Sequence, residues 1–191
     1  MMHSPRPLKV LCLCCAGLFM QAFTSTSATT LFPNTYEVKT QSLEKRGEYR
    51  YVYRLFFKLY DVALFAEADS SSSDILSAEV PFHLSFNYLR TIDKSIILES
   101  ADTILDRNLS NIERQQIADR VDLINAAYQT VREGDRSSLT YLPAEGTTLR
   151  INEQPIATIP GKDFAQLYFQ IWLGENPIST TMKSVLIGDQ K

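Results

Sequence analysis

The sequence predicts an α+β domain in which one antiparallel sheet is covered on one face by helices. Three observations support this fold class. Residues 49–65 and 81–90 are rich in aromatic and β-branched side chains, which favour strands. Residues 92–131 instead repeat their apolar side chains at helical spacing. Strand patterns then return, and two further helical segments close the chain.

The first strong pattern, Tyr49–Phe65, contains neither Gly nor Pro and predicts one long strand. Period-two alternation would place four polar or charged side chains on one of its faces, Arg50, Arg54, Lys58 and Tyr60. Asp61 then falls on the apolar side, so we expect a bulge or turn beside it. The polar run Asp69–Asp74 predicts a loop, and Pro81–Arg90 alternates again as a half-buried strand.

Two helices are predicted roughly between Asp93 and Arg132. Ser110 and Glu113 match a capping box, in which the serine and glutamate side chains each satisfy a backbone N–H at the start of a helix. The Glu-Gly-Asp sequence at 133–135 is the expected stop.

The remaining elements are shorter. Strands are predicted at 138–142, 147–151 and 155–159, with turns at Glu145-Gly146 and Asn152-Glu153. A helix then opens at 160–163 and ends at Gly174, and a last one opens at 177–179 and ends at Gly188.

The N-terminal segment predicts export. Arg6 and Lys9 precede the apolar run Val10–Phe23, and small polar residues follow up to Ala28, which is the layout of a secretory signal peptide. We expect a signal peptide over 1–28 and a single domain over 29–191, with a periplasmic or secreted location. Cleavage would remove all three cysteines and lower the formal charge from −3 to −5. No later segment is long and apolar enough to span a membrane.

Composition narrows the possible functions. A net negative charge argues against nucleic-acid binding, which usually requires a dense basic face. Seven glycines and no phosphate-binding loop leave little material for a nucleotide site, so we predict no cofactor. His83 is the only histidine after the signal peptide; we expect an ordinary residue on the polar face of its strand and no metal site.

The basic strand is the main candidate site. Two arginines, a lysine and a phenol interleaved with apolar groups could hold an anionic head group, with the apolar neighbours holding a tail. The alternative is a solvated sheet face whose cations pair with nearby acids.

Three stretches resemble bacterial chalcone isomerase-like proteins. They are residues 53–65, the pair 146–152 and 159–164, and above all Phe164–Ile178 with its Ile-Trp-Leu-Gly-x-x-Pro segment, closed by Leu186-Ile-Gly188. The resemblance covers about Tyr49 to Gly188. It implies an open-faced β-sandwich, with a large antiparallel sheet, a helix layer on one side and a ligand cleft between them. It also implies that Trp172 packs in the core.

The resemblance does not carry over the catalytic residues of plant chalcone isomerases. Their tyrosine belongs to the region after Arg90, yet residues 91–127 contain no tyrosine. Arg90 could stand near their lysine, and Asn108 or Asn111 near their asparagine. Related plastid proteins bind fatty acids through an arginine and a tyrosine, and Arg50 or Arg54 with Tyr60 offers that chemistry here.

We therefore expect a non-catalytic protein that binds a small amphipathic anion such as a fatty acid. The candidate ligand-binding residues are Arg50, Arg54, Lys58, Tyr60 and Arg90. A protein-interaction module is the first alternative, which an interior without a cleft would favour. An isomerase or intramolecular lyase acting on a phenolic enone is the second.

Overall fold

The computed structural model describes Met1 and residues 31–188, so the rest of the predicted signal peptide lies outside the described residues. Within 31–188, seven strands form one antiparallel sheet in chain order: β1 (Thr35–Val38), β2 (Gln41–Tyr53), β3 (Phe57–Ala66), β4 (Phe82–Tyr88), β5 (Arg136–Leu142), β6 (Gly146–Ile151) and β7 (Gln154–Ile159). The same residues form six helices: α1 (Ser72–Leu76), α2 (Lys94–Asn108), α3 (Asn111–Ala127), α4 (Lys162–Tyr168), α5 (Gln170–Leu173) and α6 (Thr180–Ile187).

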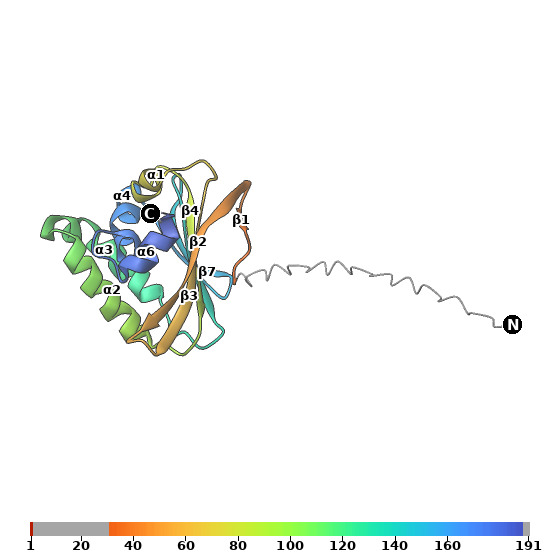
Figure 1. Ribbon diagram of the computed structural model, residues 1–191. Coiled ribbons are helices and arrows are strands. Elements are labelled where there is room, and N and C mark those ends of the chain that lie inside the picture. The colour runs from red at the N-terminus through yellow and green to blue at the C-terminus, as the bar shows by residue number, and fades with distance from the viewer. Residues whose placement is uncertain (2–30, 189–191) are drawn as a thin grey trace.

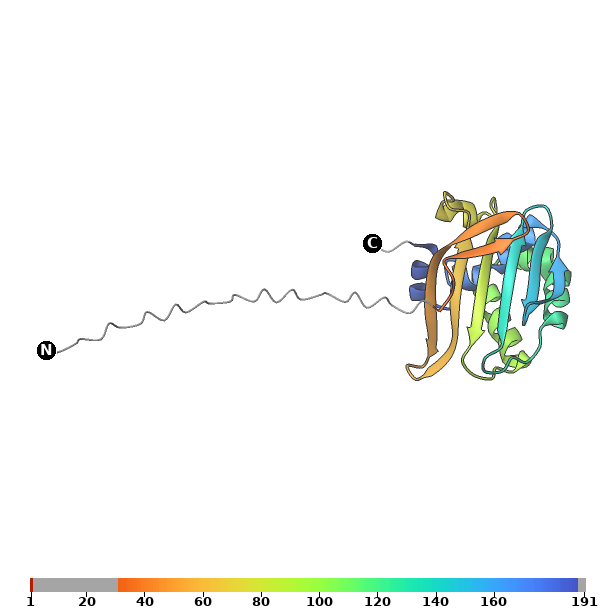
Figure 2. The ribbon, with the colours of Figure 1, turned by 90° about the vertical axis from the view of Figure 1, so that its right-hand side faces the viewer.

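All six helices lie on one side of the sheet, as Figure 1 shows with the sheet seen nearly edge-on. Figure 2 looks onto the opposite side, where the β1–β2 hairpin bends across the strands and no helix covers them. This arrangement confirms the predicted fold class. The main core lies between the sheet and the helices and includes fully buried side chains from both layers, such as Leu64, Leu84, Ile104 and Ile117.

The prediction of one strand over Tyr49–Phe65 is wrong, because the segment forms the β2–β3 hairpin. β2 ends at Tyr53, three residues turn the chain, and β3 begins at Phe57. Arg54 and Leu55 occupy the left-handed backbone region, with φ of 48° and 65°, although such turns favour Gly or Asn. The pairing shifts by one residue beside Tyr51, which leaves Leu59 as an extra residue in β3.

The predicted starts of α2 and α3 are confirmed, but the predicted end of α3 is wrong. The predicted Ser110–Glu113 capping box is present at the start of α3. However, α3 stops at Ala127 rather than near Arg132, because Tyr128 adopts an extended conformation and Val131 forms a β-bridge with Ile92. These two apolar side chains are thus buried without being helical.

The C-terminal third also follows the predicted order. Strands β5, β6 and β7 cover the predicted segments, extended by one or two residues at their starts. The helix predicted up to Gly174 is divided at Phe169 into α4 and α5. The last helix is capped by Ser179 and followed by the left-handed Gly188.

Gly47 allows α6 to pack directly on β2. A Cβ atom at Gly47 would lie 2.0 Å from the Val185 carbonyl oxygen, which is backbone and cannot rotate away. The absence of a side chain at this one position therefore sets the distance between the C-terminal helix and the sheet.

A smaller cluster closes the outer face of the sheet. Phe32, Leu43, Ala63 and Phe65 are buried there, with Tyr36 of β1 packed against them. Tyr36 also stacks on His83 of β4, with ring centroids 3.6 Å apart. His83 is 1% exposed, and its Nδ1 atom is 2.8 Å from the Thr140 hydroxyl. His83 is a strand residue, as expected, but the expected position on a polar face is wrong, because β1 covers that side of β4 and buries the ring.

The position of His83 makes folding sensitive to pH. Burial, with a smaller effect from the charge of Arg150, lowers the pKa of His83 from 6.5 to about 3. An unfolded chain would bind a proton near pH 6.5, whereas the folded chain resists protonation until about pH 3. The contribution of His83 to the free energy of unfolding is thus fully present above pH 6.5 and is lost as the pH falls from 6.5 towards about 3.

We predict that the free energy of unfolding drops by about 2 kcal/mol between about pH 7.5 and about pH 5, before most carboxylates titrate. The variant His83→Phe keeps a ring beneath Tyr36 but cannot titrate, so its stability should change much less over the same range. Urea unfolding at the two pH values measures both. Equal pH dependence of the two proteins would contradict this assignment.

Candidate ligand cavity between sheet and helices

A cavity of about 390 Å³ lies between the sheet and the helix layer. We call it the tyrosine cavity, because six of its lining residues are tyrosines: Tyr51, Tyr53, Tyr60, Tyr88, Tyr128 and Tyr168. Trp172, Phe86 and several isoleucines complete most of the wall. A volume of this size and a largely apolar lining are typical of small-molecule sites.

Strand register builds one wall of the tyrosine cavity. Tyr51 of β2 pairs with Tyr60 of β3, and Tyr60 pairs with Tyr88 of β4. The ring centroids of these two pairs are 5.2 and 6.2 Å apart. Because paired residues of neighbouring strands point to the same face, three phenols line up across three strands.

The opposite wall comes from the helices. Trp172 of α5 packs against Phe86 and Tyr168, with centroid distances of 5.4 and 6.1 Å. This confirms its expected role in packing, and it also lines the cavity. Burial increases along the tyrosines, from Tyr53 at 45% exposed to Tyr168 at 1%. The cavity therefore has an open mouth beside Tyr53 and a closed inner end.

The buried phenols are hydrogen-bonded to protein groups. The Tyr88 hydroxyl is 2.9 Å from the Ser137 hydroxyl, Tyr128 bonds to Tyr168, and Tyr60 bonds to Trp172. Burial raises the pKa of Tyr88 to about 12 and raises the pKa values of Tyr60, Tyr128 and Tyr168 as well. All four phenols are thus neutral at physiological pH.

Arg107 is the cation at the tyrosine cavity. It lies in the last turn of α2, on the face that also carries Ile96, Ser100 and Thr103. Its positive charge opposes the rise that burial causes in the pKa of Tyr51, another residue of the lining. The side chain of Arg107 is exposed and forms no ion pair or hydrogen bond with any residue in 31–188.

Glu99 is the other charged residue of the lining. It precedes Arg107 by eight residues on α2, which is about 12 Å along a helix. The two charges are therefore far enough apart for Arg107 to remain available to an anion.

Sequence reasoning missed Arg107. Its signal was the helical spacing of four, three and four residues from Ile96 through Ser100 and Thr103. Carboxylates at helical spacing, such as the neighbouring Asp102 and Asp106, are typical of a solvated face, but both pair with Arg114 of α3, at 3.0 Å each.

The structure separates the five predicted site residues. Tyr60 lines the tyrosine cavity, whereas the other four, Arg50, Arg54, Lys58 and Arg90, do not. Arg50 instead forms two hydrogen bonds to the buried carboxylate of Asp61, from Nε at 2.6 Å and Nη2 at 2.9 Å. The expectation that Arg50 and Tyr60 share a face is wrong, because they occupy adjacent, alternating positions of the β2–β3 ladder.

The other three cations surround the tip of the β2–β3 hairpin. Arg54 lies in the turn and places its guanidinium 5.2 Å from the centre of the Tyr53 ring. Arg90, just after β4, lies 5.1 Å from the centre of the Phe57 ring. Lys58 pairs with Val52, one step along the ladder from the paired Tyr51 and Tyr60.

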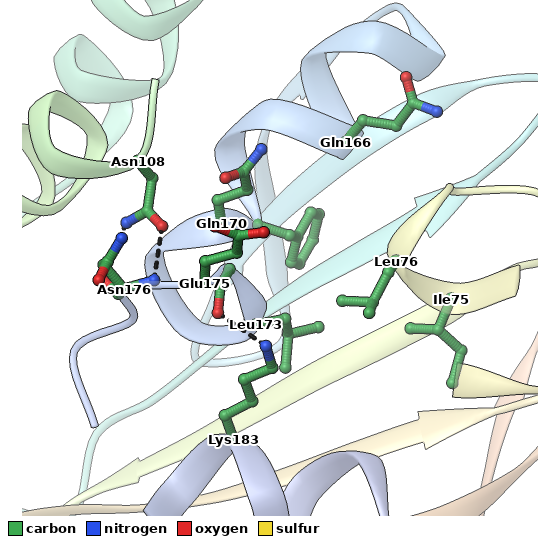
Figure 3. A pocket seen from close by; sticks show the side chains of 11 residues that line it. Ile75, Leu76, Asn108, Gln166, Gln170, Leu173, Glu175, Asn176 and Lys183 are labelled. Carbon is green, nitrogen blue, oxygen red and sulfur yellow. Dashed lines mark hydrogen bonds between the residues drawn. The ribbon is translucent and has the colours of Figure 1, made fainter. Parts of the chain in front are cut away.

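A second pocket, of about 410 Å³, has a more polar lining (Figure 3). Two of its polar side chains already have partners within it: Asn108 exchanges two hydrogen bonds with the Asn176 backbone, both 2.8 Å, and Lys183 donates to the Gly174 carbonyl at 2.9 Å. Asn108 thus fixes the loop after α5. Because the lysine of this pocket has a partner whereas Arg107 has none, we take the tyrosine cavity as the candidate site.

Two further findings bear on function. In the described part of the chain, no three His, Cys, Asp or Glu side chains are grouped in a way that could hold a metal ion. None of the helices described between residues 31 and 188 has the length and apolar character needed to cross a bilayer.

Comparisons with known proteins agree with this architecture. The profile of a family described as chalcone isomerase-like matches residues 24–188. A crystal structure of an Arabidopsis thaliana fatty-acid binding protein superposes with a TM-score of 0.61 and 11% identity, covering 83% of this chain and 91% of the plant chain. At that identity the likeness shows a shared fold. No curated protein matches the sequence.

Proposed function

The chain belongs to the chalcone isomerase-like family, and on that premise we propose that it binds a small amphipathic anion, such as a fatty acid, in the tyrosine cavity without transforming it. The structural neighbour that binds fatty acids is consistent with this proposal. The observation that carries it is the unpaired guanidinium of Arg107 at the mouth of an aromatic, otherwise mostly apolar cavity.

Arg107 and Tyr51 would hold the head group. An arginine can donate two parallel hydrogen bonds to a carboxylate, and a phenol can donate a third. Arg107 and Tyr51 both line the cavity, and the positive charge of Arg107 acts to lower the pKa of Tyr51. The arginine–tyrosine pair expected from the sequence is thus proposed with Arg107 and Tyr51 in place of Arg50 or Arg54 and Tyr60.

The apolar wall would hold the tail. Phe86, Ile171 and Trp172 face the interior of the cavity together with the buried tyrosines. Each methylene transferred from water to such a surface contributes about 0.8 kcal/mol. Affinity should therefore rise about fourfold for each added methylene until the cavity is filled.

The protonation of the phenols favours binding over catalysis. A tyrosine acting as a general base, or as a phenolate stabiliser, needs a pKa near the working pH. The four buried phenols of the cavity have raised pKa values, so none of them is tuned for proton removal. The presence of a cavity also favours ligand binding over a protein-interaction module.

We propose as well that the protein works outside the cytoplasm, on the strength of the signal-peptide pattern over 1–28. Expression of the full chain in a Gram-negative host should yield a periplasmic protein without its leader. Mass spectrometry of the periplasmic fraction should then find an N-terminus at or close to Thr29. Recovery of the uncleaved chain in the cytoplasm would contradict export.

Arg107→Gln should weaken the binding of a fatty acid by about 5- to 10-fold, because one charge-assisted bond at an exposed site is lost. The methyl ester of the same acid carries no charge, so its affinity should be unchanged. Both can be followed in delipidated protein by the fluorescence of Trp172, the sole tryptophan in the sequence, which lines the cavity.

Arg54→Gln serves as the matched control. It removes one guanidinium from the hairpin tip, outside the cavity lining, and should leave both affinities unaltered in solution. A loss of acid binding in Arg54→Gln but not in Arg107→Gln would instead support the site expected from the sequence. Failure of the wild-type protein to bind any fatty acid at micromolar concentration would refute the proposal.

A further inference from the structure

The tip of the β2–β3 hairpin, residues 52–58, is an exposed apolar surface. Leu55 and Phe56 are 87% and 83% exposed, the highest values for large apolar side chains within residues 31–188. Val52, Tyr53 and Phe57 beside them are also exposed. Single exposed apolar residues are common, but five clustered on one projecting turn suggest an interaction surface.

The turn itself is not built for stability. Arg54 and Leu55 both lie at positive φ, where large side chains are strained and where Gly or Asn is favoured. The chain instead places a large apolar side chain at the apex and another directly after it. The side chains of the tip therefore matter for something other than closing the hairpin.

Positive charge surrounds the same tip. The side chains of Arg54, Lys58 and Arg90 form no ion pair or hydrogen bond with any described residue. Arg54 and Arg90 instead lie over the rings of Tyr53 and Phe57. Residues 49–60 contain no acidic side chain, although the whole chain has a net charge of −3. The tip is thus a basic, apolar projection on an acidic protein.

We propose that this tip docks on the surface of an anionic lipid bilayer, with Leu55 and Phe56 inserted between lipids and the three cations against the head groups. An anionic membrane surface attracts Lys and Arg side chains, and exposed apolar side chains beside them can insert into it. A protein partner is less suited, because a stable protein interface uses about 20 to 30 residues from each side. The tip offers only the seven residues 52–58 and Arg90.

The tip is continuous with the mouth of the tyrosine cavity. Tyr53 and Leu59 line the cavity, and Leu59 accepts a backbone hydrogen bond from Leu89, next to Arg90. The exposed Ile96 of α2 borders the same opening. Docking through the tip would therefore hold the mouth against the lipid surface. Docking goes beyond the ligand-binding proposal and does not depend on it.

Co-sedimentation with vesicles tests the docking. The proteins begin at Thr29, which keeps the apolar run Val10–Phe23 out of the assay and retains all the helices and strands described within residues 31–188. The wild-type protein should bind vesicles of mixed phosphatidylglycerol and phosphatidylcholine. It should bind pure phosphatidylcholine at least about 10-fold more weakly, and added salt should weaken its binding to the anionic vesicles.

Two double variants separate the apolar and charged contributions. Leu55→Ser/Phe56→Ser should reduce partitioning to anionic vesicles by at least about 10-fold, since two inserted side chains are lost. Arg54→Gln/Lys58→Gln should reduce it by about 10-fold or more. The matched control, Ile112→Ser/Leu123→Ser, removes two apolar side chains that are 78% and 58% exposed on α3 and should bind like the wild type.

Each contrary result has a defined meaning. Equal binding to both vesicle types, or an unchanged Leu55→Ser/Phe56→Ser variant, would overturn the proposal. So would self-association that the same variant abolishes in the absence of vesicle binding, because the tip would then be an interface between copies. The vesicle assay contains no fatty acid and the ligand assay contains no vesicles, so a failed ligand assay and a failed docking assay can be told apart.

Discussion

The register of β2 against β3 is the constraint on which the candidate site depends. Arg50 and Asp61 are paired residues of the ladder, and the guanidinium binds both oxygens of a carboxylate that is 1% exposed. A slip of one residue would leave that carboxylate buried without its partner, which is costly. The same register places Tyr51 opposite Tyr60 on the cavity side. An ion pair on the outer face thus fixes the aromatic wall on the inner one.

The sequence predicted the layers well because most elements carry local signals. The Ser110–Glu113 capping box and the Ser179 and Gly188 caps mark helix ends with their own hydrogen bonds or backbone geometry. The β2–β3 turn carries no such signal, since Arg54, Leu55 and Phe56 continue the strand-like composition on either side. The predicted strand alternation therefore continued through the β2–β3 turn, and this placed Arg50, Arg54 and Lys58 on one face.

The cleft between sheet and helices was expected from the family resemblance, but the residue pattern alone does not predict it. Periodicity identifies the face of a helix or strand that is buried, but it does not distinguish a filled interior from a hollow one. Arg107 was overlooked for a related reason, because it lies among carboxylates on α2, and such a charged stretch is typical of a solvated helix face. Arg114 of the next helix neutralises them instead. That partner is brought close only by the packing of α2 on α3.

The hydrogen bonds between the buried phenols have a consequence for the thermodynamics of binding. Because Tyr88 bonds to Ser137, Tyr128 bonds to Tyr168 and the Tyr60 oxygen accepts from the Trp172 N–H, the inner end of the cavity offers few free partners for water. Water there would be poorly ordered, and a ligand that displaces it releases little entropy. Association should then be driven by enthalpy, with a negative change in heat capacity, in contrast to the usual entropic signature of apolar transfer.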